Sequence, residues 1–339
     1  MKNYKVNQLS LILIFLSFIF NAYSSDVFTE SQLNTFIKTY SAKYKIPANF
    51  IEDSLTEAEF QDSTYNMQVN MLESSKKKPK PWSVYRRQFI NQRTIDLGAD
   101  FYCEYKPTFK KAQAKYGVPP EIILGILGVE TSYGGFTGHY RMIDTLTTLA
   151  FNSPRRVDFF QDELANYLAM CYENHLNPTK LIGAIDGGFG LAQFMPSSYR
   201  QFAVGDNEDK SPDLFSPKDA ILSIANYFNK HGWQRGGNVI LDVKISPKTC
   251  KNLICDQKFL SYPIVTWQKN GVIVKHQASD TTTMASVITL QSMYRSQAWL
   301  ALNNFFVIFA YNHSHKYAMV VYQLGNAVLK QVSIDGSCK

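Results

Sequence analysis

Hydrophobic positions recur with helical spacing over most of the chain. Between about residues 30 and 235, apolar residues return every three or four positions, as they do on one face of an α-helix. Pairs at 153–154, 177–178 and 216–217 each place a Ser or Asn before a proline at the first helical position, which is typical of helix starts. From Ser216 the pattern continues to a stop near His231. These features predict a mainly α protein.

The pattern changes to period two between about residues 237 and 276. Apolar and polar residues alternate over 241–245, and the apolar positions of 265–274 flank Asn270-Gly271, a pair typical of hairpin turns. Helical spacing resumes near residue 283 and continues to 297. We therefore predict a small β insertion, after which the chain returns to the helical part.

Composition places the chain among globular proteins. It has 339 residues, of which 45% are hydrophobic and 19% charged, so it is large enough for about two domains, and disorder, collagen and coiled coil are excluded. The formal charge is +7, or +5 without Lys2 and Lys5, which is compatible with an anionic polymer as partner. The basic run at 76–80 is interpreted as a solvated loop, with polyanion binding as the alternative; no nucleic-acid partner is expected.

Residues 1–25 have the three parts of a secretory signal peptide. Lys2 and Lys5 precede an uncharged apolar run at 9–20, and small residues at 22 and 24 suit cleavage. The run is shorter than the roughly 20 residues of a transmembrane helix. Because the first cysteine is Cys103, we expect export to the periplasm without a lipid anchor. A retained signal anchor is the alternative.

An oxidising compartment favours disulfides among the cysteines. Cys250 and Cys255 are the best candidates, because their spacing closes a small loop within the β segment. The odd total leaves one thiol free or bridged elsewhere. The five cysteines are Cys103, Cys171, Cys250, Cys255 and Cys338.

One carboxylate in an apolar helix is the first candidate for chemistry. Pro120 opens a helix whose apolar residues cover every face, so the helix must be buried. Glu130 lies at its far end, where apolar neighbours and the helix dipole both favour the protonated acid and raise its pKa. A protonated carboxyl near neutral pH suits a general acid. The alternative is a structural ion pair with Arg141 or Arg156.

A glycine-rich stretch supplies a second candidate. Gly187, Gly188 and Gly190 leave backbone groups accessible to a ligand. Gln193 follows, beside an aromatic residue and a methionine, which suits a sugar ring with an N-acetyl group. A tight packing corner between helices is the alternative interpretation.

These motifs together resemble the membrane-bound lytic murein transglycosylase B family in order and spacing. The resemblance covers residues 80 to 328 and includes GVPPEIILGILGVETSYG, SPRR, GLAQFMPSSY, ANYFNKHGW and NNFFVIFAYNHSHKYAMVVYQLG. It implies a lysozyme-like helical core that cleaves the β-1,4 bond between N-acetylmuramic acid and N-acetylglucosamine in peptidoglycan, without hydrolysis and without a cofactor or metal. Glu130 then acts as acid and as base, and the product has a 1,6-anhydro end.

The resemblance also assigns the other site residues. Gln193 binds the sugar, Tyr311 and Asn312 line the cleft near the reacting centre, and Tyr227 and Tyr317 add stacking or hydrogen-bonding faces. Core packing is the alternative for each tyrosine. Arg155 and Arg156 match the family's paired arginines, which suit an acidic peptide stem.

The chain departs from the family pattern in three places. Ala184 replaces a serine whose hydroxyl lies near the catalytic carboxyl. Gly205 and Ser216 replace the carboxylates at the two ends of a calcium-binding loop found in some members, so no tight calcium site is expected. The lipid-bearing cysteine of the family's named member is also missing.

The expected organisation combines these elements. We divide the chain into the signal peptide (1–25), an N-terminal helical lobe (26–100), a lysozyme-like core (101–236), the β insertion (237–280) and a C-terminal section that returns to the core (281–339). We expect a monomer that acts on glycan strands, with cell-wall synthesis or division proteins as candidate partners. Two rival functions remain: a hydrolytic muramidase that uses Glu130 with Asp186, and a catalytically weak wall-binding protein.

Overall fold

The computed structural model describes residues 27–207, 211–275, 280–336 and 338, and all structural statements concern these residues. The predicted signal peptide, residues 1–25, lies outside them.

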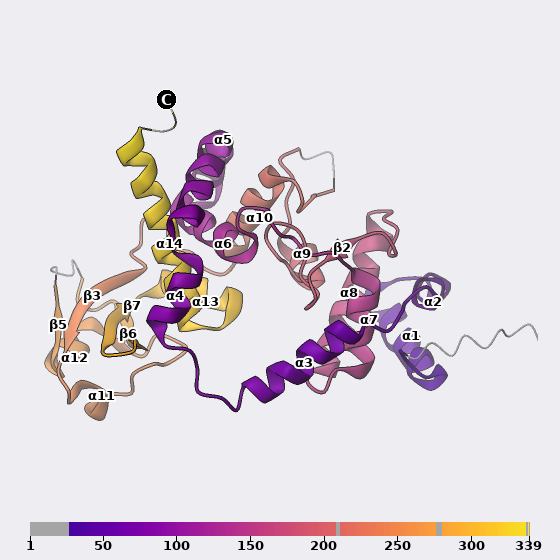
Figure 1. Ribbon diagram of the computed structural model, residues 1–339, viewed down its shortest axis with the longest axis horizontal. Coiled ribbons are helices and arrows are strands. Elements are labelled where there is room, and N and C mark those ends of the chain that lie inside the picture. The colour runs from indigo at the N-terminus through magenta and orange to yellow at the C-terminus, as the bar shows by residue number, and fades with distance from the viewer. Residues whose placement is uncertain (1–26, 208–210, 276–279, 337, 339) are drawn as a thin grey trace, which may run out of the picture.

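Helices make up most of this part of the chain and form two groups (Figure 1). One group lies at the right of Figure 1, where the three N-terminal helices pack on two later ones; its members are α1 (Glu30–Tyr44), α2 (Ala48–Thr56), α3 (Asp62–Ser74), α7 (Met142–Asn152) and α8 (Val157–Glu173). The other surrounds the contact between α6 and α14; its members are α4 (Trp82–Phe89), α5 (Gln92–Tyr116), α6 (Pro120–Thr131), α10 (Pro217–Lys230), α13 (Asn303–Asn312) and α14 (His315–Asp335). One hydrophobic core runs through both groups, from Phe36 to Val328. The prediction of a mainly α protein is confirmed.

A five-stranded antiparallel sheet lies at the left of Figure 1, in the order β4-β6-β7-β3-β5. The segment that forms the sheet contains five strands and two short helices: β3 (Ile240–Ile245), α11 (Thr249–Asn252), β4 (Tyr262–Pro263), α12 (Ile264–Lys269), β5 (Val272–Val274), β6 (Met284–Gln291) and β7 (Ser296–Ala301). The sheet has a small core of its own around Trp267 and Val287. The β insertion therefore exists, as predicted.

The helical prediction for 283–297 is wrong, because this segment forms β6 and the start of β7. The error has a physical reason. Both faces of these strands are buried: Val287 points into the small core of the sheet, whereas Ile288 and Leu290 join the large helical core. A strand that is buried on both faces loses the alternation of apolar and polar residues by which a strand is recognised.

One predicted hairpin turn and two predicted helix starts are also wrong. Asn270-Gly271 ends the short helix α12, with Gly271 at φ +88°, and does not close a hairpin. Pro154 lies in a turn after α7 and does not start a helix. The Ser153 hydroxyl donates to the carbonyl of Arg155 within this turn, so it does not act as a helix cap. Asn177 likewise accepts from the backbone of Thr179 in a local turn. The helix predicted from Ser216 is confirmed as α10.

Two of the expected domain boundaries also need correction. Residue 100 falls inside α5, whose 25 residues pack on α6, α10 and α14 in the central group. The boundary at residue 280 falls before β6 and β7, which complete the sheet. The sheet therefore spans residues 240–301, and the return to the core begins with α13.

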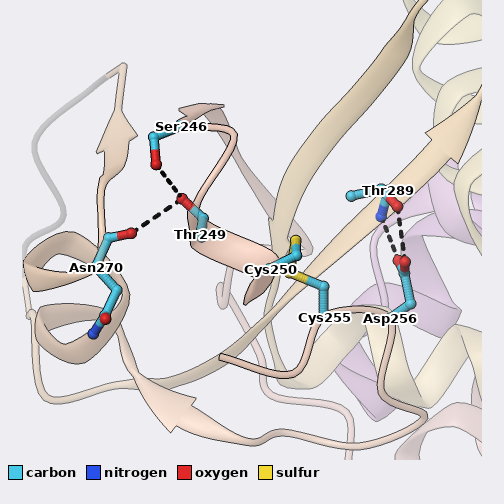
Figure 2. Close-up of a disulfide and its surroundings, with 7 residues drawn as sticks. All are labelled: Ser246, Thr249, Cys250, Cys255, Asp256, Asn270 and Thr289. Atoms are coloured by element: carbon cyan, nitrogen blue, oxygen red, sulfur yellow. Dashed lines mark hydrogen bonds between the residues drawn. A yellow bond between two sulfur atoms is a disulfide. The ribbon is translucent and has the colours of Figure 1, made fainter. Parts of the chain in front are cut away.

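Two disulfides are present among these residues. Cys250 and Cys255 are bonded as predicted, across α11 and the turn that follows it (Figure 2). Cys103 on α5 is bonded to Cys338, beyond the end of α14, a pairing that the sequence did not indicate. Cys171 is a buried free thiol. No helix within the described ranges has the length and apolar character needed to cross a bilayer.

Candidate active site

The candidate acid lies at the end of α6. Pro120 occupies the first helical position, where its missing N–H costs nothing, and the following residues from Ile122 to Leu127 are buried. The helix ends at Thr131, because Ser132 adopts the left-handed conformation with φ +50°. Glu130 is therefore held in the last turn, and it is partly exposed.

Close contact between α6 and α14 determines what faces Glu130. A Cβ at Gly125 would lie 2.1 Å from the carbonyl oxygen of Val321, and a Cβ at Gly325 would lie 1.6 Å from that of Glu121. The two backbones approach this closely only because both positions are glycines. The same antiparallel register then brings Tyr317, in the first turn of α14, to Glu130.

Tyr317 donates a hydrogen bond from its hydroxyl to Oε1 of Glu130. The tyrosine is buried, and Ser314 caps the start of α14 by accepting from its backbone N–H. The predicted role of Tyr317 as a hydrogen-bonding residue at the site is therefore consistent with its position. Neither arginine proposed as a structural partner of Glu130 contacts it: Arg141 pairs with Glu59 and Asp144, and Arg156 lies over the ring of Phe159.

The surroundings of Glu130 raise the pKa of its carboxyl from 4.5 to about 7, so that its protonated and charged forms are both populated near neutral pH. Burial is the largest cause of the raised pKa, the Tyr317 hydrogen bond lowers the pKa, and the charge of Asp186 raises it. The predicted direction is confirmed, with desolvation as its main cause. A carboxyl with this pKa is present as both acid and base at pH 7, so it can donate a proton and later accept one.

Two more tyrosines continue the site from Tyr317. The ring of Tyr311, at the end of α13, is stacked on that of Tyr317 with centroids 6.3 Å apart, and its hydroxyl donates to the carbonyl of Ala192 at 2.6 Å. Tyr227 on α10 packs edge-on against Tyr311 at 4.9 Å but is itself buried. Tyr227 thus contributes mainly to packing behind Tyr311. Asn312, the last residue of α13, is exposed.

The glycine-rich stretch lies on the other side of Tyr311. It follows β2 (Ile182–Gly183), which pairs with β1 (Tyr140–Arg141), and precedes α9 (Pro196–Phe202). Gln193 adopts φ +50°, and its side-chain amide donates to the carbonyl of Gly190 at 2.8 Å and to that of Thr137 at 3.3 Å. These bonds orient the amide and leave Oε1 as its acceptor. The backbone of Ala192 meets Tyr311, so the stretch is fixed beside the tyrosines.

Arg155 and Arg156 do not join this group. Both are exposed and follow the end of α7, whose start adjoins β1. The 11 residues of α7 span roughly 16 Å at 1.5 Å per residue. The structure therefore places the two arginines about one helix length from β1, between α7 and α8, and these two helices lie at the right of Figure 1.

Sequence reasoning missed Tyr85. Burial raises the pKa of this residue of α4, and the charge of Glu130 raises it further, so Tyr85 lies within electrostatic reach of the acid. Its ring packs on Phe89 at 5.2 Å and on Trp82 at 6.3 Å. The only signal was its place three residues after Trp82, within the stretch that resembles the family.

The loop that binds calcium in some family members does not fit that ion in its described part. Asp206 forms an ion pair with Lys111 at 2.6 Å, and Lys218 lies 3.9 Å from its other oxygen. The two carboxylate oxygens of Asp219 accept the backbone N–H groups of Asp206 and Asp213, at 2.9 Å each. An ammonium group has no lone pair and repels a cation, so the ion pair with Lys111 opposes the binding of calcium at Asp206.

We predict that calcium leaves the stability unchanged. Thermal unfolding in about 1 mM calcium and in EDTA should give midpoints within about 1 °C, because a site with a micromolar dissociation constant would instead add about 4 kcal/mol. Magnesium at the same concentration controls for ionic strength. An increase of several degrees with calcium alone would contradict the prediction.

Removal of the Tyr317 hydroxyl should shift the pH profile. Its hydrogen bond stabilises the charged carboxylate, so Tyr317→Phe raises the pKa of Glu130 above its value of about 7. The alkaline limb of kcat/KM, which requires the protonated acid, should move up by about one pH unit. Tyr311→Phe is the matched control, because its hydroxyl bonds to Ala192 and not to Glu130. Equal midpoints in Tyr317→Phe and the wild type would refute the assignment.

Comparison with known proteins agrees with this geometry. The family model described as transglycosylase SLT domain matches residues 29–326. Membrane-bound lytic murein transglycosylase B of Escherichia coli (strain K12) is 36% identical over 302 residues, which cover 86% of this chain and 81% of the relative.

Solved structures share the fold. The lytic transglycosylase SLT35 of Escherichia coli in complex with calcium has a TM-score of 0.79 at 35% identity, covering 88% of this chain and 93% of that one. SltB3 of Pseudomonas aeruginosa in complex with NAG-NAM-pentapeptide has a TM-score of 0.76 at 25% identity, covering 91% and 80%. The expected family and its helical fold are confirmed.

Proposed function

Because this chain belongs to the transglycosylase SLT domain family, we propose that it cleaves the β-1,4 bond between N-acetylmuramic acid and N-acetylglucosamine of peptidoglycan as a lytic transglycosylase, with Glu130 as its single acid and base. The observation that supports the role of Glu130 is a carboxyl with a pKa of about 7 that is partly exposed and bonded to Tyr317.

The reaction needs two proton transfers at this carboxyl. Glu130 first donates its proton to the glycosidic oxygen, and the bond between that oxygen and C1 of the muramyl residue breaks. The resulting carboxylate then accepts the proton of the muramyl 6-hydroxyl while the 6-oxygen forms a bond to C1. Glu130 ends protonated, no water is consumed, and the product is a 1,6-anhydro ring. A pKa near the working pH serves both transfers.

The neighbours of Glu130 have separate roles in this proposal. Tyr317 orients the carboxyl and stabilises its charged form. Gln193, whose amide N–H groups donate to two backbone carbonyls, accepts from the sugar's polar groups through Oε1, and Tyr311 and Asn312 border the reacting ring. Arg155 and Arg156, at the far end of α7, bind acidic groups of the substrate that lie distant from the reacting bond.

Many family members have a serine where this chain has Ala184, and its hydroxyl lies near the catalytic carboxyl. Ala184 offers no such hydroxyl. Within the described ranges, Tyr317 is the hydrogen-bond donor that stabilises the Glu130 carboxylate. A second donor would lower the pKa further, so the alanine favours the protonated acid. A carboxyl of higher pKa is the weaker acid and its carboxylate the stronger base, so we expect the alanine to slow the first proton transfer and to assist the second.

A hydrolytic muramidase is the second candidate, because Asp186 lies near enough to affect Glu130. Asp186 is exposed, and its carboxylate accepts from the N–H of Gly188 at 3.4 Å. In this alternative it would act as nucleophile or activate a water molecule.

Mass spectrometry of the soluble products distinguishes the two reactions. Purified protein is incubated with peptidoglycan beside the Asp186→Asn variant. The proposal predicts anhydro-muropeptides from both proteins, whereas reducing ends that disappear in Asp186→Asn would establish the hydrolase. No release by the wild type would favour a wall-binding protein.

This function is consistent with a particular cellular location, oligomeric state and set of partners. We propose that the protein is exported to the periplasm, where glycan strands are its substrate, and that it acts as a monomer. Cell-wall synthesis or division proteins are its candidate partners. Fractionation of cells that carry the full chain would test the location.

A further inference from the structure

The first turn of α14 links the five-stranded sheet to the candidate acid. Tyr317, which bonds to Glu130, is the third residue of this helix, and α14 packs on β6 of the sheet as well as on α6. None of the residues assigned above to the site comes from the sheet. Its contact with α14 is therefore a route by which the sheet can act on Glu130 from outside the site.

His315 makes a polar contact between the helix and the sheet segment. It is the first residue of α14, and its Nε2 lies 2.9 Å from the carbonyl oxygen of Gln257, in the chain between α11 and β4. A carbonyl oxygen only accepts, so Nε2 carries the hydrogen and donates it. Burial is the main cause that lowers the pKa of the imidazole, so the neutral ring predominates at pH 7.

Aromatic rings hold this imidazole from the helical side. Phe309 and Phe305 of α13 are both buried, and their ring centroids lie 5.1 Å and 6.0 Å from that of His315. The bond to Gln257 therefore has a defined direction. In these apolar surroundings the loss of the carbonyl would leave the N–H of the ring without a partner, which is unfavourable.

The acceptor of this bond is fixed to the sheet (Figure 2). The carboxylate of Asp256, next to Gln257, accepts from the backbone N–H of Thr289 at 2.6 Å and from its hydroxyl at 2.8 Å. The N–H of Asp256 donates to the carbonyl of Val287 at 2.8 Å, and Thr289 and Val287 both belong to β6. The preceding residue, Cys255, is held by its disulfide. The Gln257 carbonyl thus keeps the position that β6 gives it.

A second bond holds the same turn of α14 from the other side. Lys316 donates to the carbonyl oxygen of Lys80, just before α4. The turn is therefore tied to the sheet through His315 and to the start of α4 through Lys316. Helix ends fray. A loosened first turn would weaken the bond between Tyr317 and Glu130, because the tyrosine lies in that turn.

We propose that His315 is a positioning residue, through which the sheet keeps Tyr317 in hydrogen-bond contact with Glu130. The inference rests on the proposed function, because the position of Tyr317 matters to the reaction only if Glu130 is its acid and base. The Tyr317 bond lowers the pKa of the Glu130 carboxyl. Loss of the bond between His315 and Gln257 therefore raises this pKa, although His315 itself does not touch the acid.

Two substitutions separate the hydrogen bond of His315 from the packing of its ring. His315→Leu fills much of the same space without an N–H, whereas the amide of His315→Gln can still donate to Gln257. Infrared difference spectra between each protein and the same protein with Glu130→Gln follow the protonated carboxyl of Glu130 with pH, without substrate. His315→Leu should raise the midpoint by about half a pH unit, and His315→Gln should leave it within about 0.2 pH units. The alkaline limb of kcat/KM should move with the midpoint.

Controls identify the route of the effect. If His315 acts through the tyrosine, His315→Leu should cause no further shift in a protein that already carries Tyr317→Phe. His175→Gln, which replaces an exposed histidine beyond the end of α8, should leave the midpoint unchanged. Circular dichroism spectra and unfolding midpoints verify that the variants are folded. If His315→Leu does not fold, His315→Met replaces it, because its flexible thioether side chain also lacks a donor.

The outcomes separate this inference from the proposed function. An unchanged midpoint in the folded variant without a donor, or an equal shift in His315→Gln, would overturn the inference even if anhydro products are formed. A further shift in the absence of the Tyr317 hydroxyl would also overturn it. The expected shifts without anhydro products would instead overturn the proposed function alone.

Discussion

Replacement of Glu130 by Gln should lower the release of anhydro-muropeptides by about 10³- to 10⁴-fold, because the amide can neither donate the first proton nor accept the second. The residue is held by the end of α6 and by Tyr317, and an amide fits the same space and accepts the same hydrogen bond. Product release per enzyme, followed by mass spectrometry, measures the effect.

Glu121→Gln is the matched control for this substitution. It makes the same chemical change at the other end of α6, away from Tyr317. Turnover should remain close to that of the wild type. If Glu130→Gln retained more than about a tenth of the activity, Glu130 would not be the general acid.

The difference in stability between Glu130→Gln and the wild type should depend on pH. The folded pKa of Glu130, about 7, lies above its ordinary value of 4.5, so the folded state binds the proton more tightly. The stabilisation from this proton is fully present below pH 4.5 and is lost as the pH rises through 7. Glu130→Gln should therefore match the wild type at low pH and exceed it above pH 7, by on the order of 2–3 kcal/mol in the free energy of unfolding. Denaturant unfolding at both ends of this range measures the difference.

Addition of a single methyl group at Gly325 should have the largest effect on stability. Its Cβ would lie 1.6 Å from the carbonyl oxygen of Glu121, a backbone atom that cannot move without displacing α6. Gly325→Ala should therefore lower the free energy of unfolding by at least about 3 kcal/mol. Since the same helix contact aligns Tyr317 with Glu130, residual folded protein should also lose activity.

Asn326→Ala controls for the change in helix propensity. Asn326 is exposed and lies next to Gly325 on α14, so its replacement should change stability by no more than about 0.5 kcal/mol. Guanidinium unfolding of both variants gives the comparison. If Gly325→Ala unfolded at the same denaturant concentration as Asn326→Ala, the close approach of α6 and α14 would be refuted.

The sequence by itself determined those features that depend on neighbouring residues. The helix from Ser216 has its start signal and its apolar face within one stretch, and it was predicted correctly. The Cys250–Cys255 disulfide closes a loop so short that its spacing predicted it. The raised pKa of Glu130 followed from the apolar residues of its own helix, because desolvation is the main cause of the shift.

Only the tertiary structure decided what meets across the fold. Tyr317 reaches Glu130 because α14 packs on α6, and Tyr85 comes within its electrostatic reach from α4, which packs on α14. The resemblance to the family named Tyr317, but the residues around it in the sequence did not indicate its contact with Glu130. The segment that forms β6 and the start of β7 was predicted as a helix because its two faces are buried in two different cores. The existence of two cores is a property of the whole chain and not of this segment. Local patterns record burial and turn geometry, whereas contacts between distant segments depend on how their buried faces pack together.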